Sequence, residues 1–137
     1  MISYRILIVD DEKTQRDMLA GFLEKEGYSV ATAKSGFEAI EICQDKYFEV
    51  ALIDLKMPGM DGIELLKKLK EMNPEIQAIM MTAYGSVETA VEAMKMGAYH
   101  YVNKPINLDE LKLNIKKALE NYHLLAENKY LKEELEE

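Results

Sequence analysis

The sequence has one cysteine and no apolar run of membrane-spanning length, and each shortage excludes a class of protein. The lone cysteine, Cys43, cannot build a disulfide framework within the chain, and its apolar neighbours predict a small buried residue. The N-terminus lacks the charged, apolar and small-residue sections of a secretory signal. We therefore expect a cytoplasmic protein that does not act at a membrane.

Basic residues are also in short supply. The chain has 17 lysines and arginines against 25 aspartates and glutamates, which gives a formal net charge of −8. Because binding to a phosphate backbone requires clustered basic residues, and none are clustered here, we expect no direct binding of nucleic acid. The length of 137 residues and the hydrophobic fraction of 48% predict one globular domain with a single core.

Short apolar runs alternate along the chain with segments in which apolar residues recur at helical spacing. The strand-like runs are 5–9, 28–32, 50–53, 77–81 and 100–103. The helical segments are 13–26, 62–71, 86–96 and 108 onward, and three polar residues stand three positions before a glutamate, as helix N-caps do: Ser35, Asp61 and Asn107. The alternation predicts an α/β fold with a doubly wound, five-stranded parallel sheet in the flavodoxin-like order 2-1-3-4-5.

Polar residues follow four of the predicted strands at the points where the strands end. They are Asp10 and Asp11, Asp54, Thr82 and Lys104. Because ligands of such a sheet bind outside the carboxyl ends of its strands, we expect these side chains to converge. Clustered carboxylates repel one another unless they share a proton or a cation, and hard oxygen ligands favour Mg²⁺. For Asp10 or Asp11 alone, the alternative is a cap on the following helix.

Four ordered segments resemble the signature of response-regulator receiver domains of two-component systems. They are Ile8 to Glu12, Asp54 to Gly62, Thr82-Ala83 and Lys104-Pro105, within a resemblance that covers about residues 4–120. The segment 85–98 is similar to receivers of sigma-54-dependent, nitrogen-regulatory protein C-like transcription activators. In those proteins a helical linker leads to an AAA+ ATPase and a DNA-binding domain, which we expect in the full-length protein.

The resemblance implies a role for each residue at the strand ends. Asp54 accepts a phosphoryl group from a sensor histidine kinase, and Thr82 and Lys104 contact phosphoryl oxygens. The implied Mg²⁺ ligands are Asp10 (through water), Asp11, Asp54 and the backbone carbonyl of Lys56. A cis peptide bond before Pro105 would aim Lys104 inward. Such a protein is not an enzyme in the usual sense, because it catalyses only its own phosphorylation and dephosphorylation.

The implied switch couples Thr82 to Tyr101, three residues before Lys104. Thr82 would move toward the phosphoryl group and Tyr101 would turn inward, which would alter the surface formed by the predicted fourth helix, fifth strand and fifth helix. The alternative is that Tyr101 is a static core aromatic.

The helical composition continues from residue 121 to residue 137 without glycine or proline. Residues three and four apart fall into heptad positions, with asparagine at a and leucine at d: Asn121, Leu124, Asn128, Leu131 and Leu135. This spacing predicts a receiver domain over 1–120 followed by a helical linker that pairs two chains as a parallel coiled coil. The alternative for so short a repeat is a frayed, solvated helix. The chain has no phosphate-binding Gly-rich Lys-Ser/Thr loop, and its charged end favours a fragment over a natural stand-alone regulator.

Two further functions stay open from the sequence. A Mg²⁺-dependent phosphatase would also use an aspartyl phosphate, but its Asp-x-Asp after the first strand is absent, since Asp10-Asp11-Glu12 stands there. A dimeric adaptor that ignores phosphate would not need the complete acidic set.

Overall fold

The computed structural model describes residues 3–83 and 87–136, with the backbone alone for Val87, Tyr130 and 132–136. Five parallel strands within these ranges form one sheet of order β2-β1-β3-β4-β5, which confirms the predicted fold class. The strands are β1 (Arg5–Val9), β2 (Ser29–Ala33), β3 (Val50–Asp54), β4 (Gln77–Thr82) and β5 (His100–Asn103).

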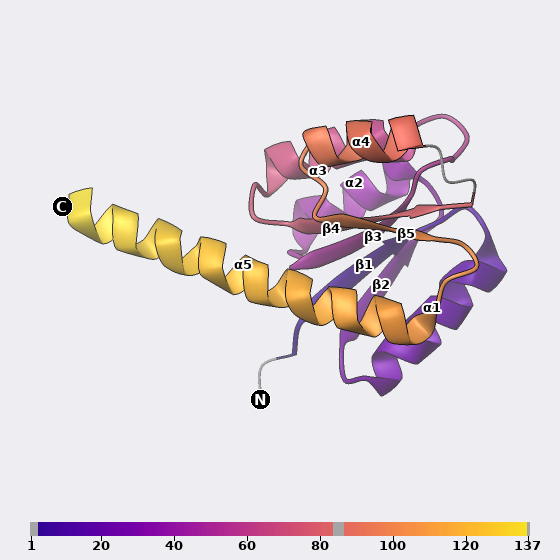
Figure 1. The fold of residues 1–137 in the computed structure, drawn as a ribbon, viewed down its shortest axis with the longest axis horizontal. Helices are drawn as coiled ribbons and strands as arrows, with labels where there is room; N and C mark the ends of the chain where they lie inside the picture. The colour runs from indigo at the N-terminus through magenta and orange to yellow at the C-terminus, as the bar shows by residue number, and fades with distance from the viewer. Residues whose placement is uncertain (1–2, 84–86, 137) are drawn as a thin grey trace.

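Helices cover both faces of the sheet (Figure 1). One face carries α1 (Lys13–Lys25) and α5 (Leu108–Glu136), and the other carries α2 (Gly36–Asp45), α3 (Gly62–Met72) and α4 (Val87–Lys95). The predicted helix bounds agree to within about one residue, although Ser86, where the fourth helix was expected to begin, lies outside the described residues. None of the described helices is long and apolar enough to cross a membrane.

Successive residues of each central strand pack alternately into two hydrophobic cores, one on each face of the sheet. In β1, Leu7 and Val9 pack with α2 and α3, whereas Ile6 and Ile8 pack with α1 and α5. The central strands are therefore apolar at successive positions, as expected for a parallel sheet buried on both sides. Cys43 packs against the α2–α3 core, but it is only partly buried, and burial raises the pKa of its thiol.

The three predicted N-caps are confirmed. Each side-chain oxygen accepts a hydrogen bond from the backbone N–H of the glutamate three residues later: Ser35 from Glu38 at 3.2 Å, Asp61 from Glu64 at 2.9 Å and Asn107 from Glu110 at 3.0 Å. The Glu38 carboxylate reaches back, but it accepts from the Lys34 N–H at 3.3 Å instead of the Ser35 N–H. These caps fix where α2, α3 and α5 begin, directly after the loops at the carboxyl edge of the sheet.

Helix α5 runs through residue 120 without a break and projects well beyond the sheet (Figure 1). Its second half is tied to the amino-terminal edge of the sheet by four side-chain pairs, which we call the α5 clasp. They are Asn121 with Gln77 (2.7 Å), Tyr122 with Tyr47 (3.0 Å), Lys129 with Glu75 (3.3 Å) and His123 with Tyr4. Residues 121–129 therefore contact the same body as residues 108–120. The assignment of 121–137 as a linker stays a prediction.

Candidate functional site

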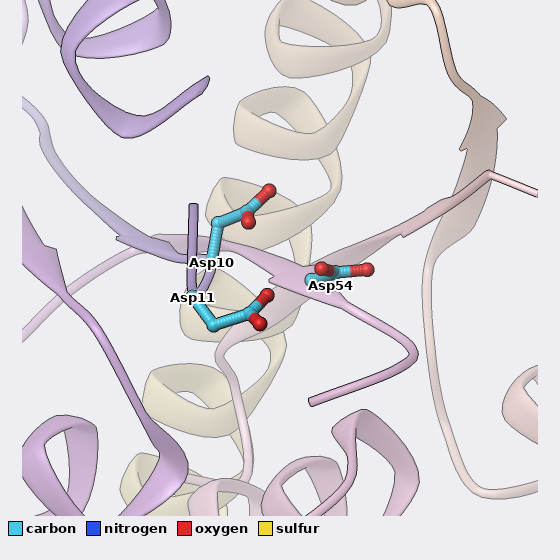
Figure 2. A group of neighbouring side chains, drawn as sticks. All are labelled: Asp10, Asp11 and Asp54. Atoms are coloured by element: carbon cyan, nitrogen blue, oxygen red, sulfur yellow. The ribbon is translucent and has the colours of Figure 1, made fainter. Parts of the chain in front are cut away.

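Three aspartates from two neighbouring strands meet at the carboxyl edge of the sheet. Strands β1 and β3 pair in parallel with Val9 beside Ile53, so Asp10 and Asp54 occupy matching positions one residue later. The carboxylates of Asp10, Asp11 and Asp54 point toward a common space (Figure 2), and one oxygen from each lies within 4.8 Å of the others. The predicted convergence of these side chains is therefore present.

Lys104 joins two of these carboxylates from the fifth strand end. Its Nζ lies 2.9 Å from Asp10 Oδ2 and 3.3 Å from Asp54 Oδ2. The Lys104–Pro105 peptide bond is cis, as the resemblance implied. Burial alone would lower the pKa of Lys104, but its hydrogen bond to Asp10 and the charge of Asp54 outweigh burial and raise it. The lysine is therefore held charged, beside Asp54.

Asp54 is almost fully buried, and the pKa of its carboxyl is raised from 3.8 to about 6, chiefly by burial. That net shift already includes the charge of Asp10, which also raises the pKa, and Lys104 and the Lys56 N–H, which lower it; the Lys56 N–H donates to Asp54 Oδ1 at 3.4 Å. The carboxylate is thus less stable than it would be in water, and an additional cation near it would be stabilising.

Asp10 shapes the turn before α1 and does not cap that helix. The N-cap position of α1 is Glu12, which makes no side-chain capping bond. Asp10 Oδ1 instead accepts the Glu12 N–H at 2.9 Å, and the Asp10 carbonyl accepts a bond from Arg16 Nη1 at 2.7 Å. The other carboxylate oxygen of Asp10, Oδ2, accepts a hydrogen bond from Lys104 Nζ. For Asp10, the helix-cap alternative is therefore wrong.

The loop after β3 packs closely on the strand end because position 62 is glycine. A Cβ on Gly62 would lie 2.4 Å from the Asp54 carbonyl oxygen and 2.8 Å from the Leu55 Cα, and both of these are backbone atoms that cannot move aside. Gly59 has a φ of +80°, a conformation that favours glycine. The two glycines allow the loop to bring the Lys56 backbone N–H to 3.4 Å from Asp54 Oδ1.

Two cavities meet at this edge of the sheet. The smaller, of about 190 Å³, is lined by Asp11, Glu12, Asp54, Leu55, Lys56, Thr82, Ala83 and Lys104. The larger, of about 690 Å³, shares Leu55, Lys56 and Thr82 with it and extends to Asp61 and Ile63 on one side and to Thr89 and Glu92 of α4 on the other. The sequence interpretation missed this second set, although Thr89 and Glu92 stand three apart and thus share a helix face.

The donor set fits a hard divalent cation. Three carboxylates supply oxygen ligands, which Mg²⁺ prefers. Lys104 compensates only part of their negative charge, and the pKa of Asp54 is raised mainly by burial and also by the charge of Asp10. Such an acidic triad is typical of a magnesium-binding receiver site.

The two predicted switch residues lie on neighbouring strands. Thr82, at the end of β4, is buried, and its carbonyl accepts the Lys104 N–H at 2.8 Å. Tyr101 pairs with Met80 across β4 and β5, and 37% of its surface is exposed. It lines a cavity of about 360 Å³ together with Ala90, Val91, Met94 and Lys95 of α4. Tyr101 is therefore not a buried core aromatic in this structure.

The predicted coiled-coil residues do not share one environment. Asn121 bonds to Gln77 within the same chain, so its side chain faces the body. Leu124 and Leu131 are 59% and 47% exposed, and Asn128 is exposed as well. The side chain of Leu135 lies outside the described residues. Leu124 and Leu131 are therefore exposed seven positions apart, while Asn121 already has an intramolecular partner, and the coiled coil stays a prediction.

Comparisons with known proteins agree with this site. The model of the family "Response regulator receiver domain" matches residues 6–116. Transcriptional regulatory protein ZraR of Escherichia coli (strain K12) is 46% identical over 118 residues, which are 86% of this chain and 27% of that protein. Sporulation initiation phosphotransferase F of Bacillus subtilis (strain 168) is 40% identical over 119 residues, covering 87% of this chain and 96% of that protein.

Solved structures give the same result. The structure of NtrX from Brucella abortus superposes with a TM-score of 0.90 at 36% identity, over 95% of this chain and 30% of that chain. The chain spans about 27% of the length of the ZraR proteins that it matches. The similarity therefore concerns one domain of these longer regulators.

Proposed function

Because the chain belongs to the response regulator receiver domain family, whose members are not conventional enzymes, we propose that it is a phosphorylation-controlled switch with Asp54 as the phosphoryl acceptor. The observation that carries this proposal is the meeting of three aspartates and Lys104, of which Asp11, Asp54 and Lys104 line one cavity. Asp54 is the aspartate that both lines this cavity and contacts Lys104. The donor we propose is the phosphohistidine of a sensor histidine kinase.

The site residues have distinct proposed roles in phosphoryl transfer. We assign Asp11, Asp54 and the Lys56 carbonyl as direct Mg²⁺ ligands and Asp10 as a ligand through water. When bound, Mg²⁺ supplies positive charge to the phosphoryl oxygens. The Lys104 ammonium would pair with one equatorial oxygen, and the Thr82 hydroxyl would donate to another. The Lys56 N–H, which lies 3.4 Å from Asp54 Oδ1, would help to orient the carboxylate.

The proposed output is a movement of Tyr101 linked to Thr82. Tyr101 lies partly exposed over the cavity beside α4, so it has room to turn. A Thr82 hydroxyl drawn toward the phosphoryl group would vacate space on the neighbouring strand, which Tyr101 would fill. This rearrangement would alter the face formed by α4, β5 and α5.

We further propose that this face and the α5 extension form a homodimer in the cytoplasm. The exposed Leu124 and Leu131 support a seam there. The similarity to ZraR and NtrX supports a role as the receiver of a longer regulator, with 1–120 as the receiver, 121–137 as its linker, and sigma-54-dependent AAA+ and DNA-binding domains beyond it. Molecular mass in solution, with and without beryllofluoride as a phosphoryl mimic, tests the dimer and its dependence on activation.

Incubation with Mg²⁺ and acetyl phosphate, followed by intact-protein mass spectrometry, tests the acceptor. We expect a single phosphoryl adduct that Asp54→Asn abolishes. Asp45→Asn, at the exposed end of α2, is the matched control and should keep the adduct. Rapid multiple turnover of unrelated phosphate esters would instead identify a phosphatase. If acetyl phosphate leaves Asp54 unmodified, the result would favour a dimeric adaptor that does not depend on phosphorylation.

A further inference from the structure

The larger cavity begins where the phosphorylation site ends. It has a volume of about 690 Å³ and shares Leu55, Lys56 and Thr82 with the cavity of about 190 Å³ that contains Asp54. The smaller cavity is the place for a phosphoryl group, given its contact with Asp54 and Lys104. The group that leaves a phosphoryl donor departs on the side opposite the attacking Asp54 oxygen. The adjoining cavity offers the space for that leaving group.

Two carboxylates from different helices line the far part of this cavity. Asp61 stands at the start of α3, where its Oδ1 accepts the Glu64 N–H, and Glu92 stands in the second half of α4. Lys56 lies on the wall shared with the smaller cavity. Lys104 also lines the smaller cavity, and its Nζ lies 3.3 Å from Asp54 Oδ2. The cavity wall is thus positive beside the phosphoryl position and negative where the leaving group would lie.

Resting on the proposed function, we propose that Glu92 and Asp61 make the site select small phosphoryl donors by the charge of their leaving group. The favoured class has a phosphorus–nitrogen bond, and the disfavoured class is the acyl phosphates. Glu92 and Asp61 are therefore specificity-determining residues that repel a departing carboxylate and tolerate a departing amine. The neutral imidazole of a phosphohistidine belongs to the favoured class.

The two donor classes differ in the charge that they release. In phosphoramidate, the nitrogen is already protonated; the phosphorus–nitrogen bond breaks, its electron pair stays with nitrogen, and neutral ammonia leaves. An Asp54 oxygen supplies the electron pair of the new oxygen–phosphorus bond. In acetyl phosphate, the same attack breaks an oxygen–phosphorus bond, and acetate departs with that electron pair and a negative charge. Only the second reaction brings an anion toward Glu92 and Asp61.

The test compares the rates of Asp54 phosphorylation by phosphoramidate and by acetyl phosphate, with Mg²⁺ present, in the full chain and in Glu92→Gln. Removal of one carboxylate at about 8 Å through a solvent-like medium changes the energy of an anion enough for about a two- to threefold effect. We expect the acetyl phosphate rate to rise about two- to threefold and the phosphoramidate rate to stay nearly unchanged. Asp61→Asn, which keeps an oxygen for the α3 cap, should act in the same direction.

Glu88→Gln is the matched control, because Glu88 lies on the same helix, is exposed, and does not line the cavity. Glu88→Gln changes the net charge by the same amount as Glu92→Gln. Its ratio of the acetyl phosphate rate to the phosphoramidate rate should equal that of the unaltered chain. A change of about two- to threefold confined to the cavity variants, and weakened by added salt, supports the inference. Equal ratios in Glu92→Gln, Asp61→Asn and Glu88→Gln overturn it while leaving the proposed function intact. If neither donor modifies Asp54, the proposed function fails and the inference falls with it.

Discussion

Asn121 of α5 donates a hydrogen bond of 2.7 Å to Gln77 at the first position of β4. Gln77 is only 2% exposed, and its own Nε2 donates to the Glu75 carbonyl at 2.7 Å. The receiver family match ends at residue 116, five residues before Asn121. The α5 clasp is therefore a set of contacts between the body and a segment that the family pattern does not include.

The first prediction concerns this hydrogen bond. Asn121→Ala leaves the side-chain oxygen Oε1 of the buried Gln77 without its Asn121 donor, so we expect the free energy of unfolding to fall by about 1–2 kcal/mol. Denaturant unfolding followed by circular dichroism measures the change. Asn128→Ala is the matched control on the exposed part of the same helix, and it should change stability by less than about 0.5 kcal/mol. Equal losses in the two variants would contradict an anchoring role for Asn121.

The second prediction concerns Gly62, whose added Cβ would lie 2.4 Å from the Asp54 carbonyl oxygen. Gly62→Ala should lower the free energy of unfolding by about 1–3 kcal/mol and weaken Mg²⁺ binding, because the loop that carries Lys56 must move away. Thermal unfolding and a Mg²⁺ titration measure both effects.

Gly21 is the control for Gly62, because it lies inside α1 and nothing lies within 4 Å of its added Cβ. Gly21→Ala should raise the free energy of unfolding by about 0.5–1 kcal/mol and leave Mg²⁺ binding unchanged. A Gly62→Ala protein with full Mg²⁺ affinity would disprove the role of this close packing.

The third prediction is a pH dependence caused by Asp54. Its folded pKa, about 6, lies above the ordinary value of 3.8, so the folded state binds more protons than the unfolded state between these values. The corresponding stability is present below pH 3.8 and is lost as the pH rises through 6. Without Mg²⁺, Asp54→Asn should therefore become the more stable protein by roughly 2 kcal/mol at pH 7, with little difference near pH 4.

Urea unfolding of both proteins at pH 4, 5, 6 and 7 tests this dependence. Saturating Mg²⁺ should stabilise the original chain more than Asp54→Asn, because the ion binds the folded state of the original chain more tightly. The difference in unfolding free energy between the two proteins at pH 7 should therefore become smaller. Asp45→Asn, whose carboxyl is exposed, should follow the original chain at every pH. If the two proteins differ in unfolding free energy by the same amount at pH 4 and pH 7, ionisation of Asp54 is not the cause of the difference.

The fourth prediction concerns Tyr101. With fluorotyrosine incorporated and beryllofluoride and Mg²⁺ added, the ¹⁹F resonance of Tyr101 should shift as the ring leaves its half-exposed position beside α4. Tyr47 is the internal control, because it lies at the opposite edge of the sheet, bonded to Tyr122. A Tyr101 signal that stays unchanged on activation would show that this ring is not the switch.

The strand ends were predictable because topology alone brings them together. In a parallel sheet, the residues that follow the strands lie at one edge, so the strand assignment placed Asp10 and Asp54 as neighbours. It put Lys104 at the same edge, although β4 lies between β3 and β5. The N-caps at Ser35, Asp61 and Asn107 were predictable for a similar reason, since each depends on residues three apart.

The contacts of α5 were not predictable in the same way. Asn121 and Gln77 are 44 positions apart, and His123 and Tyr4 are 119 apart, so no local pattern links them. Heptad spacing placed Asn121 with Leu124 and Leu131 in one coiled-coil seam, which stays a prediction. The two leucines are exposed, whereas Asn121 contacts Gln77, and the spacing carries no information about a buried glutamine at the sheet edge. The acidic wall of the larger cavity was missed because Asp61 and Glu92 come from helices whose packing the sequence does not specify.

The continuity of α5 from Leu108 to Glu136 also fixes an angular relationship. In an unbroken helix, each residue added or removed advances the end by about 1.5 Å and turns it by about 100°. The α5 clasp holds the helix on the body as far as Lys129. The direction in which a reporter domain fused after Glu136 faces around the helix axis would therefore depend on the number of helical residues between Lys129 and the reporter. A single inserted residue would point the reporter to a different side, whereas a seven-residue insertion would return it to within about 20° of the original direction.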